Sequence, residues 1–341
     1  MGTSHQMDRA ELGIIGGSGL YDFEGLDDQR AIEMSTPFGA PSGPITMGRY
    51  GERRIAFLSR HGQGHRLSPT AIPVRANIWA LKSLGVTRIV SISAMGSLQA
   101  NLAPRDFIVP DQLIDRTFSR AGTFFDEGVV AHIAFGDPFC PDLSAGAADS
   151  LASAGVRVLR GGSCVVIEGP AFSTRAESQI YRSWGASAIG MTALPEAKLA
   201  REAEICYAIM GAITDYDTWH ATEADVNVET VVGNLTHTVA SARRALVTLF
   251  SAALPKQRHC PCASALEGAI ITVPAMIAEE QKHALRWWLD DTGQRDFWKI
   301  RLGSRAVPAQ NARGGADRVV KRKGEVDGKT SAGGTLHPRL G

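Results

Sequence analysis

The sequence predicts an α/β fold: a single domain whose central mixed β-sheet is flanked by helices. Two observations lead to this prediction. Runs rich in β-branched and apolar residues alternate with segments of helical periodicity over about 250 residues. Several of these runs are apolar throughout, which is typical of strands covered on both faces. A chain of 341 residues is also long enough to bury a sizeable core.

The expected strands follow from the apolar runs. A short run ends in the loop GGSG at 16–19, and longer runs mark further strands at 54–59, 88–94, 106–110, 164–169 and 205–214. Helices are expected at 73–84, 174–184, 195–204 and 225–253. In the first of these, Val74, Ile78, Leu81 and Leu84 have helical spacing, and Gly85 ends the run.

The composition divides the chain into three parts. Residues 1–10 are expected to be a loose lead, 11–277 the folded domain, and 278–341 an extension with a helix at 278–291 followed by a disordered basic tail. Truncation after Ile277 is therefore expected to leave activity in place.

Bulk properties exclude several functional classes. A net charge of +1 gives no overall attraction to nucleic acid or anionic membranes, so neither is expected as a partner. The longest apolar stretches are too short to cross a bilayer, and the first ten residues contain no hydrophobic signal core. The sequence therefore predicts a cytoplasmic protein.

Five cysteines fall into two groups. Cys140, Cys164 and Cys206 lie in apolar surroundings and are expected to be buried thiols. Cys260 and Cys262 form a Cys-Pro-Cys motif that is too tight for the common CxxC patterns, and no second pair in the sequence completes a metal site. We expect no metal and a surface turn here, with a redox-sensitive pair as the alternative.

The loop GGSG at the end of the first strand suggests phosphate binding. The dinucleotide fingerprint G-x-G-x-x-G fails because Asp22 stands where the third glycine is required. A P-loop fails because no lysine follows the last glycine. What remains is a turn with backbone N–H groups and the Ser18 hydroxyl, suited to one small anion. An ordinary flexible turn explains the same residues.

Two further strand ends have similar chemistry. Arg60 and His61 follow the strand at 54–59, and Ser93 and Ala94 end the strand at 88–94. Arginine offers a rigid fork for phosphate oxygens, and histidine is expected to add a donor. Open α/β sheets bind ligands beyond the carboxyl ends of their strands, so a shared anion site is predicted. For Arg60 and His61, an ordinary pair on the protein surface remains an alternative.

A family resemblance emerges from motifs spread along the chain in a fixed order. They are IIGGSGLY, TPFGAPS, RHGQGH, RANIWALKSLGV, SAMGSL, DQLIDRT, DPFCP, IEGPAFSTRAES, GMTALPEAKLARE and TDYDTW. Together they resemble the 5′-methylthioadenosine phosphorylase branch of the purine nucleoside phosphorylase family, from about residue 11 to about 277. The resemblance implies a homotrimer that uses no metal or organic cofactor. Its implied substrates are 5′-methylthioadenosine and phosphate, and its products adenine and 5-methylthioribose 1-phosphate.

The resemblance also implies roles for individual residues. The phosphate site would comprise Ser18, Arg60, His61, Ser93, Ala94 and Thr192. Around the nucleoside it places Met191 beneath the ribose, Phe172 near the base with Ser173 beside it, Asp215 and Asp217 at the purine, and His132 and Val228 near the 5′ substituent. His132 is expected to come from a neighbouring subunit.

The residue types suit this chemistry. Asp215 can protonate N7 of the departing purine if a closed pocket raises its pKa. On a strand, Asp215 and Asp217 would point the same way, and carboxylates accept hydrogen bonds from a 6-amino group but not from a 6-oxo group. The pair therefore favours adenine, although a surface turn that caps the next helix would also explain D-x-D.

Two alternatives remain open at this point. Most relatives have asparagine where this chain has Gly190, and glycine also occurs in relatives that cleave 5′-methylthioinosine; in those relatives, however, the aspartates are replaced. A 5′-methylthioinosine or other purine nucleoside phosphorylase is thus one alternative. An inactive nucleoside-binding or scaffold protein is the other, although the candidate phosphate ligands are all retained.

Overall fold

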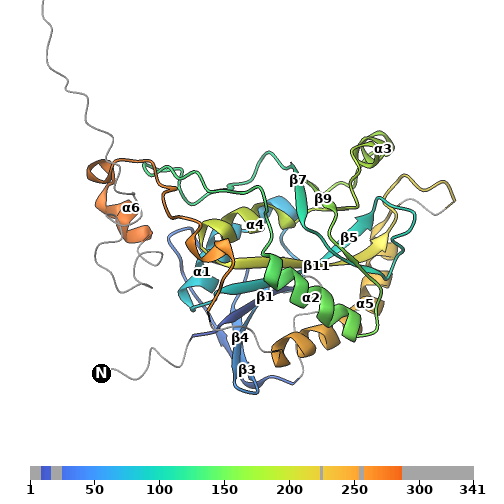
Figure 1. Ribbon diagram of the computed structural model, residues 1–341, viewed down its shortest axis with the longest axis horizontal. Helices are drawn as coiled ribbons and strands as arrows, with labels where there is room; N and C mark the ends of the chain where they lie inside the picture. Colours follow the sequence, from blue (N-terminus) through green and yellow to red (C-terminus); the bar gives the residue numbers. More distant parts are fainter. Residues whose placement is uncertain (1–8, 17–24, 223–225, 253–256, 286–341) are drawn as a thin grey trace, which may run out of the picture. The chain divides into compact units, whose positions relative to one another are not determined.

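The computed structural model describes residues 9–16, 25–222, 226–252 and 257–285. Within them, eleven strands form one mixed sheet, as the sequence predicts (Figure 1). The strands are β1 (Leu12–Gly16), β2 (Asp27–Ile32), β3 (Ile45–Tyr50), β4 (Arg53–Ser59), β5 (Arg88–Ser97), β6 (Phe107–Val109), β7 (Gln112–Arg116), β8 (Val158–Arg160), β9 (Ser163–Ile167), β10 (Ala188–Gly190) and β11 (Cys206–Asp215). Six helices and three short 3-10 turns accompany them: α1 (Val74–Ser83), α2 (Pro141–Ser153), α3 (Arg175–Ser183), α4 (Ala193–Glu202), α5 (Val228–Ser251), α6 (Glu279–Ala284), η2 (Pro69–Ala71), η3 (Pro261–Ser264) and η4 (Pro274–Met276).

Four parallel strands form the centre of the sheet. β1 pairs with β4 and with β5, and β5 pairs with β11 over almost its whole length. The main order is β2-β3-β4-β1-β5-β10-β9-β7, while β11 continues from β5 to β6 and β8. Because β4, β1, β5 and β11 are parallel, their carboxyl ends meet at one edge, where ligands are expected to bind.

The core lies on both faces of this central region. Along β11, Tyr207 and Ile209 pack on one face in a cluster that includes α1 and α4 residues. Ala208 and Met210, which alternate with them, pack on the other face against α2 and α5. Side chains of a strand alternate between faces, so a strand covered on both sides is apolar at every position. This is why residues 205–214 read as a continuous apolar run.

Every strand and helix predicted inside the described domain is confirmed, with boundaries that shift by a few residues. Several elements were missed. β2 has the polar, mostly exposed sequence DDQRAI, and β10 is only three residues long. α2 consists largely of alanine, serine and glycine, so its apolar stripe is too weak to detect from the sequence.

The predicted extension is only partly visible. Of the helix expected at 278–291, the structure describes α6 at Glu279–Ala284, and residues 286–341, with the expected basic tail, lie outside the described part. The loose lead is described only for its last two residues. Ile277 and Leu285 are both buried in the core cluster that contains α1 and α4 residues.

The prediction of a surface turn at the Cys-Pro-Cys motif is wrong. Cys260 and Cys262 are buried, because η3, which starts between them, packs against the α2–α5 face of the sheet. Cys140 and Cys206 lie beside them and supply a second pair that sequence spacing does not reveal. Burial of Cys140, Cys164 and Cys206 is confirmed.

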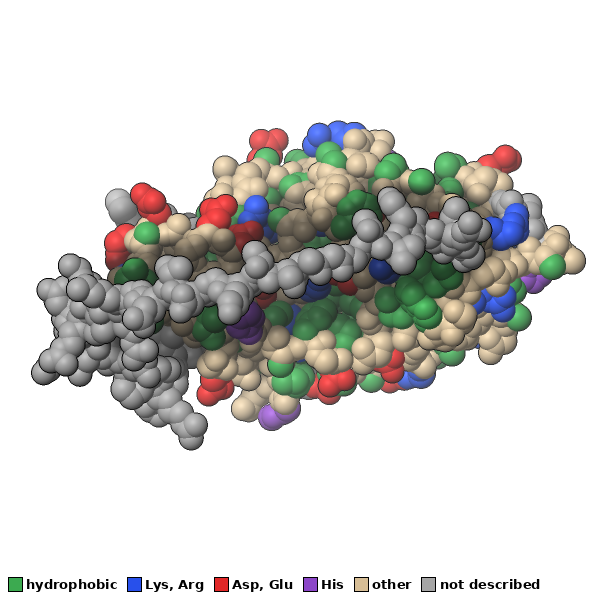
Figure 2. Space-filling view, turned by 90° about the horizontal axis from the view of Figure 1, so that it is seen from above, with side chains coloured by type: hydrophobic (Ala, Val, Ile, Leu, Met, Phe, Trp, Pro, Cys, Tyr) green, Lys and Arg blue, Asp and Glu red, His purple; other side chains and the backbone are tan. Residues whose placement is uncertain are grey.

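In Figure 2, acidic and basic side chains are scattered over the visible face among hydrophobic side chains, and neither charge forms a continuous patch there. Within the described ranges, no helix combines the length and apolarity that a membrane crossing requires.

Candidate active site

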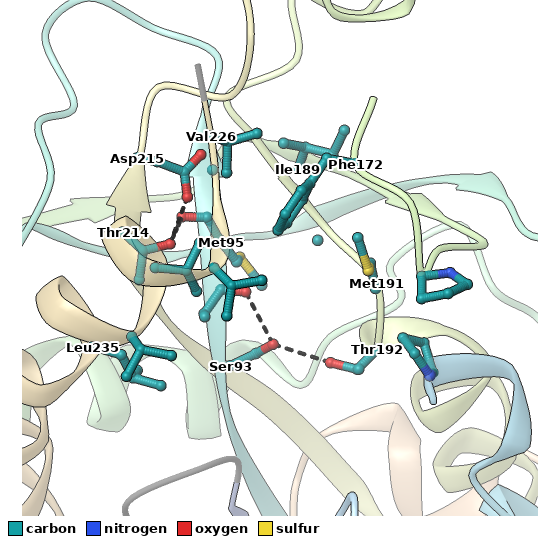
Figure 3. Close-up of a pocket in the computed structure, with 18 of the residues that line it drawn as sticks. Ser93, Met95, Phe172, Ile189, Met191, Thr192, Thr214, Asp215, Val226 and Leu235 are labelled. Carbon is teal, nitrogen blue, oxygen red and sulfur yellow. Dashed lines mark hydrogen bonds between the residues drawn. The ribbon is translucent and has the colours of Figure 1, made fainter. Parts of the chain in front are cut away.

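A cavity of about 730 Å³ opens at the carboxyl ends of the central strands (Figure 3). This size suits a ligand as large as a nucleoside together with an anion. Its walls are mostly apolar, and its polar side chains form two groups. One group lies at the end of β4, inside β5 and at the start of α4, and the other lies at the end of β11.

The first polar group centres on two hydroxyls. Ser93 does not end its strand as predicted, because β5 continues to Ser97. Ser93 and Thr192, the residue before α4, are buried, and their side-chain oxygens lie 3.0 Å apart. Figure 3 shows the two hydroxyls meeting at the cavity wall. The chain after Thr192 is not a regular helical turn, because Leu194 has extended backbone angles and Pro195 follows it, so the two hydroxyls are the polar groups of this wall. Ala94 lines the cavity next to Ser93.

Arg60 lies beneath this group and is almost fully buried, with 1% of its surface exposed. Its Nε donates to Glu196 at 2.6 Å, and its Nη atoms donate to Ser91 and to the carbonyls of Ile92 and Ile15. The alternative of a surface Arg-His pair is thereby excluded. Most of the guanidinium N–H groups already have protein acceptors. Its charge is held in a fixed position at the cavity and is paired with the buried Glu196 carboxylate.

His61 borders the same group but has a different role from the expected donor. Burial, together with the nearby Arg60 charge, lowers the pKa of His61 to about 4, so the ring is neutral near pH 7. Its Nδ1 lies 2.8 Å from the Leu67 carbonyl, which requires the proton on Nδ1. Nε2 is then an acceptor, suited to a protonated phosphate oxygen or a sugar hydroxyl. The His65 ring stacks on the His61 ring, with the two ring centroids 4.0 Å apart.

The second polar group is the aspartate pair. Asp215 is the last residue of β11, and its carboxylate accepts from Thr214 Oγ1 and from the backbone N–H of Asp217, both at 2.7 Å. Burial raises the pKa of Asp215, although these hydrogen bonds oppose the shift. A buried carboxyl with a raised pKa is the arrangement needed for proton donation to a leaving base.

Asp217 reaches the cavity from a turn and not from a strand. Asp217 lies beyond the end of β11 and has a φ of 52°. The rule that residues i and i+2 of a strand point the same way therefore does not explain its position. The tight turn, closed by its N–H bond to Asp215, brings it to the cavity instead. Burial raises its pKa to about 6, and its Oδ2 finds no hydrogen-bond partner within the described ranges. A buried polar atom without a partner favours a ligand that supplies one.

Apolar side chains separate the two polar groups. In Figure 3, Met95 lies between the hydroxyl pair and Asp215, and Met191, Ile189 and Phe172 form the opposite side of the cavity. Phe172 is partly exposed and Ser173 is buried, and both line the cavity. Arg120 fixes the Met191 segment, because its Nη1 donates to the carbonyls of Met191 and Leu194.

A further apolar wall comes from α5. Its side chains at the cavity follow i, i+3, i+4, i+7 spacing: Val228, Val231, Val232, Leu235 and Val239. Val228 is thus placed at the cavity, but this stripe as a whole was missed, because an apolar stripe on a helix normally predicts core contact. The sequence shows the helical spacing of these side chains, but it does not show that they line a cavity.

Two predicted site residues remain, of which one lies outside the described residues and the other is not brought to this cavity. Ser18 lies outside the described residues. His132 is exposed, does not line the cavity, and is held by its backbone N–H bond to Ala269. Glu196, by contrast, is a site residue that the sequence did not indicate, because its partner Arg60 lies far away in the chain.

Comparison with known proteins identifies the family. The family model described as the phosphorylase superfamily matches residues 11–251. The chain belongs to the phosphorylase superfamily. Within this superfamily, the chain is 53% identical over 275 residues to the S-methyl-5′-thioadenosine phosphorylase of Geobacter sulfurreducens, covering 80% of this chain and 96% of that protein. It is 50% identical over 278 residues to the S-methyl-5′-thioadenosine phosphorylase of Koribacter versatilis, and this match covers 80% of this chain and 95% of that protein.

Solved structures of methylthioadenosine phosphorylases superimpose on this chain. A methylthioadenosine phosphorylase from an Antarctic soil metagenomic library superimposes with a TM-score of 0.78 at 43% identity, over 82% of this chain and 99% of that one. The Schistosoma mansoni methylthioadenosine phosphorylase in complex with adenine superimposes with a TM-score of 0.68 at 34% identity. This match covers 71% of this chain and 91% of that one. The mixed-sheet single α/β domain of the phosphorylase superfamily is therefore the fold of this chain.

Proposed function

We propose that this chain catalyses the phosphorolysis of 5′-methylthioadenosine, releasing adenine and 5-methylthioribose 1-phosphate. The observation that carries the proposal is a single cavity with a hydroxyl and arginine group at one end, a buried aspartate pair at the other, and apolar walls between them. Relatives named for this activity share about half of their sequence with the chain.

The chemistry follows from the charges. Cleavage of the glycosidic bond gives the sugar oxocarbenium character and moves electrons into the purine. Phosphate bound by Ser93, Thr192, Ser18 and the charge of Arg60 would stabilise that cation and attack C1′. Asp215, whose pKa is raised by burial, would share or donate a proton to N7 of the departing adenine. The C1′–N9 bond breaks, the C1′–O bond to phosphate forms, and the proton leaves with the base.

The apolar parts of the cavity would provide specificity. Met191 would pack beneath the ribose and Phe172 would stack near the base, with Ser173 beside it. The α5 stripe offers a methylthio group contacts that a hydroxyl would not use, but a difference of this size gives discrimination of only about 10- to 200-fold. Adenosine is therefore expected as a slower substrate.

The proposal includes a homotrimer in which His132 of a neighbouring copy closes the 5′ end. His132 is exposed in the single chain and Val228 remains exposed at the cavity, so both are accessible to another copy. Light scattering coupled to gel filtration tests the assembly. A cytoplasmic location also remains a prediction, and cell fractionation tests it.

Product analysis tests the function directly. Methylthioadenosine, adenosine, methylthioinosine and inosine are incubated with the protein, with and without phosphate, and the bases are separated chromatographically. We expect phosphate-dependent adenine release that is fastest from methylthioadenosine. Preference for methylthioinosine would support the 6-oxopurine alternative, whereas binding without turnover would support the inactive one.

A further inference from the structure

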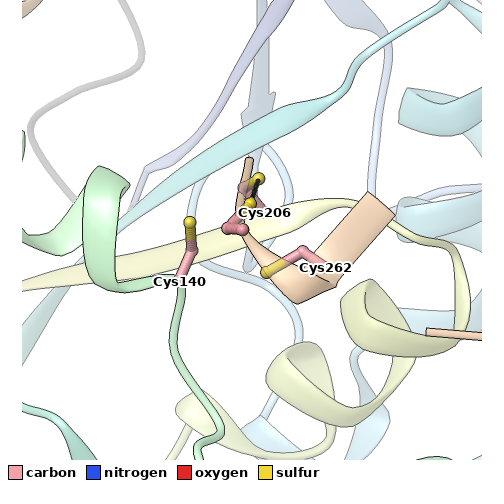
Figure 4. Close-up of side chains that lie close together, drawn as sticks. Cys140, Cys206 and Cys262 are labelled. Atoms are coloured by element: carbon pink, nitrogen blue, oxygen red, sulfur yellow. Dashed lines mark hydrogen bonds between the residues drawn. The ribbon is translucent and has the colours of Figure 1, made fainter. Parts of the chain in front are cut away.

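Four cysteines that the proposed reaction does not use converge in the core (Figure 4). Cys140 precedes α2, Cys206 begins β11, and Cys260 and Cys262 flank the start of η3. All four are buried, between 1% and 8% exposed, and all four Sγ atoms lie within 4.8 Å of one another. Three separate chain segments thus direct four thiols at one point.

The spacing fits a tetrahedral metal centre. A Zn–S bond of about 2.3 Å with tetrahedral angles separates the sulfurs of a ZnS₄ site by about 3.8 Å. No two of the four Sγ atoms here are more than 4.8 Å apart, which is at most 1 Å beyond that separation, and those of Cys206 and Cys260 are 3.4 Å apart. Two disulfides would need two pairs at about 2 Å and would not require all four sulfurs to be mutual neighbours.

The surroundings can accommodate the charge. Zinc with four thiolates has a net charge of −2, which needs nearby positive groups when it is buried. Arg258 Nη1 lies 3.9 Å from Cys206 Sγ, and its position is fixed by a 2.6 Å bond to the Glu204 carbonyl. Cys140 is the N-cap of the 13-residue α2, whose N-terminus adds partial positive charge.

We infer that Cys140, Cys206, Cys260 and Cys262 form a structural tetrathiolate site for zinc. Thiolate-only ligands select zinc over magnesium or calcium, which require oxygen ligands. Four protein ligands leave no open position, as in structural and not catalytic zinc sites. The metal would link α2, β11 and the segment that follows α5.

The site would act on stability and not on chemistry. Cys206 and Asp215 are the two ends of β11, and a ten-residue strand spans about 30 Å. The zinc site and the aspartate pair therefore lie at opposite ends of one strand. Metal loss is expected to loosen the fold without changing contacts to a nucleoside.

Metal binding by the full chain, purified under reducing conditions, tests this inference. We expect about one zinc per chain by elemental analysis. Cobalt replacing it should give thiolate-to-cobalt charge-transfer absorption and the visible bands of tetrahedral Co²⁺. Reduced, metal-depleted protein that takes up neither zinc nor cobalt overturns the inference, and this result needs no variant to fold.

Matched variants locate the site. Cys262→Ser is expected to lower the cobalt absorption severalfold, whereas Cys164→Ser, which alters the fifth and also buried cysteine, should leave it unchanged. Metal depletion should lower the melting temperature by several degrees, while the KM for methylthioadenosine stays within twofold. Cobalt absorption that survives Cys262→Ser places the metal elsewhere and contradicts the assignment. Absence of phosphorolysis would refute the proposed function alone, because metal uptake is measured independently of turnover.

Discussion

The Nε–H of Arg60 donates to Oε1 of Glu196 across 2.6 Å, although 136 residues separate the two along the chain. Both side chains are at least 98% excluded from water. The second carboxylate oxygen of Glu196 accepts from Ser91 Oγ and from the Tyr207 hydroxyl. The floor of the proposed phosphate site is therefore a buried charge network with its geometry already fixed, which favours binding without rearrangement.

Replacement of the acid in this network should be costly. Glu196→Gln leaves the Arg60 charge buried without its partner, and such losses destabilise proteins by about 3–5 kcal/mol. We expect that decrease in the free energy of unfolding, measured by urea denaturation. Asp149→Asn is the control, because the Arg160–Asp149 pair is exposed on both sides and should contribute less than about 1 kcal/mol. Equal effects of the two substitutions would contradict the role given to the network.

Asp215 is the residue on which the proposed chemistry depends most. Asp215→Asn keeps the size of the side chain but removes its exchangeable proton. We expect kcat to fall by about 10²–10⁴-fold. Phosphate binding, measured by calorimetry, should change little, because the hydroxyl and arginine group is separate. Near-normal turnover in the variant would refute proton donation by Asp215.

Gly96 holds space for the same carboxylate. A Cβ built at this position would lie 2.8 Å from Asp215 Oδ1 and 3.0 Å from Ile189 Cγ2. Gly96→Ala should therefore displace Asp215, and displacements of about 1 Å can cost about 10²-fold in rate. Gly190→Ala provides the comparison within the same cavity, because its nearest neighbour would be Met95 at an ordinary 3.5 Å. Its loss of kcat/KM should be smaller, and the reverse order would contradict this geometry.

These examples show what the sequence could predict and what it could not. Continuous apolar runs predicted the central strands, since burial on both faces determines residue type directly. Glu196 and the four-cysteine cluster depend on contacts between distant segments, which no local pattern encodes. Asp217 was placed at the cavity for the wrong reason: the sequence suggested a strand, and a turn with positive φ brings it there. The α5 stripe had a clear period, but it lines a cavity as well as packing on the core through Leu235 and Val239.

Glu202 should make stability depend on pH. Its carboxylate accepts from Thr123 Oγ1 and from the Phe124 N–H, both at 2.7 Å, and burial raises its pKa to about 7. A pKa raised by folding means that the neutral form is favoured in the native state. The resulting stabilisation is fully present below the unfolded pKa of 4.5 and is lost as pH rises through about 7.

Comparison with Glu202→Gln isolates this contribution. Relative to the variant, the wild-type free energy of unfolding should fall by up to about 3 kcal/mol between pH 4 and pH 8. Other titrating groups are common to both proteins and cancel in the difference. Glu267→Gln, at an exposed position, is the control and should show no such trend. A pH-independent difference for Glu202→Gln would refute the titration of this residue.

The position of Leu285 sharpens the prediction about the C-terminal extension. Leu285 is 4% exposed, and Ile277 packs in the same core cluster. A chain ending after Leu285 should keep the wild-type melting temperature and turnover, because the described core is then complete. A chain ending after Ile277 loses the burial of Leu285, and large-to-small changes at buried leucines cost about 2–5 kcal/mol. Its activity at low temperature should persist while its melting temperature falls; equal stability of the two truncations would show that Leu285 contributes nothing to the core.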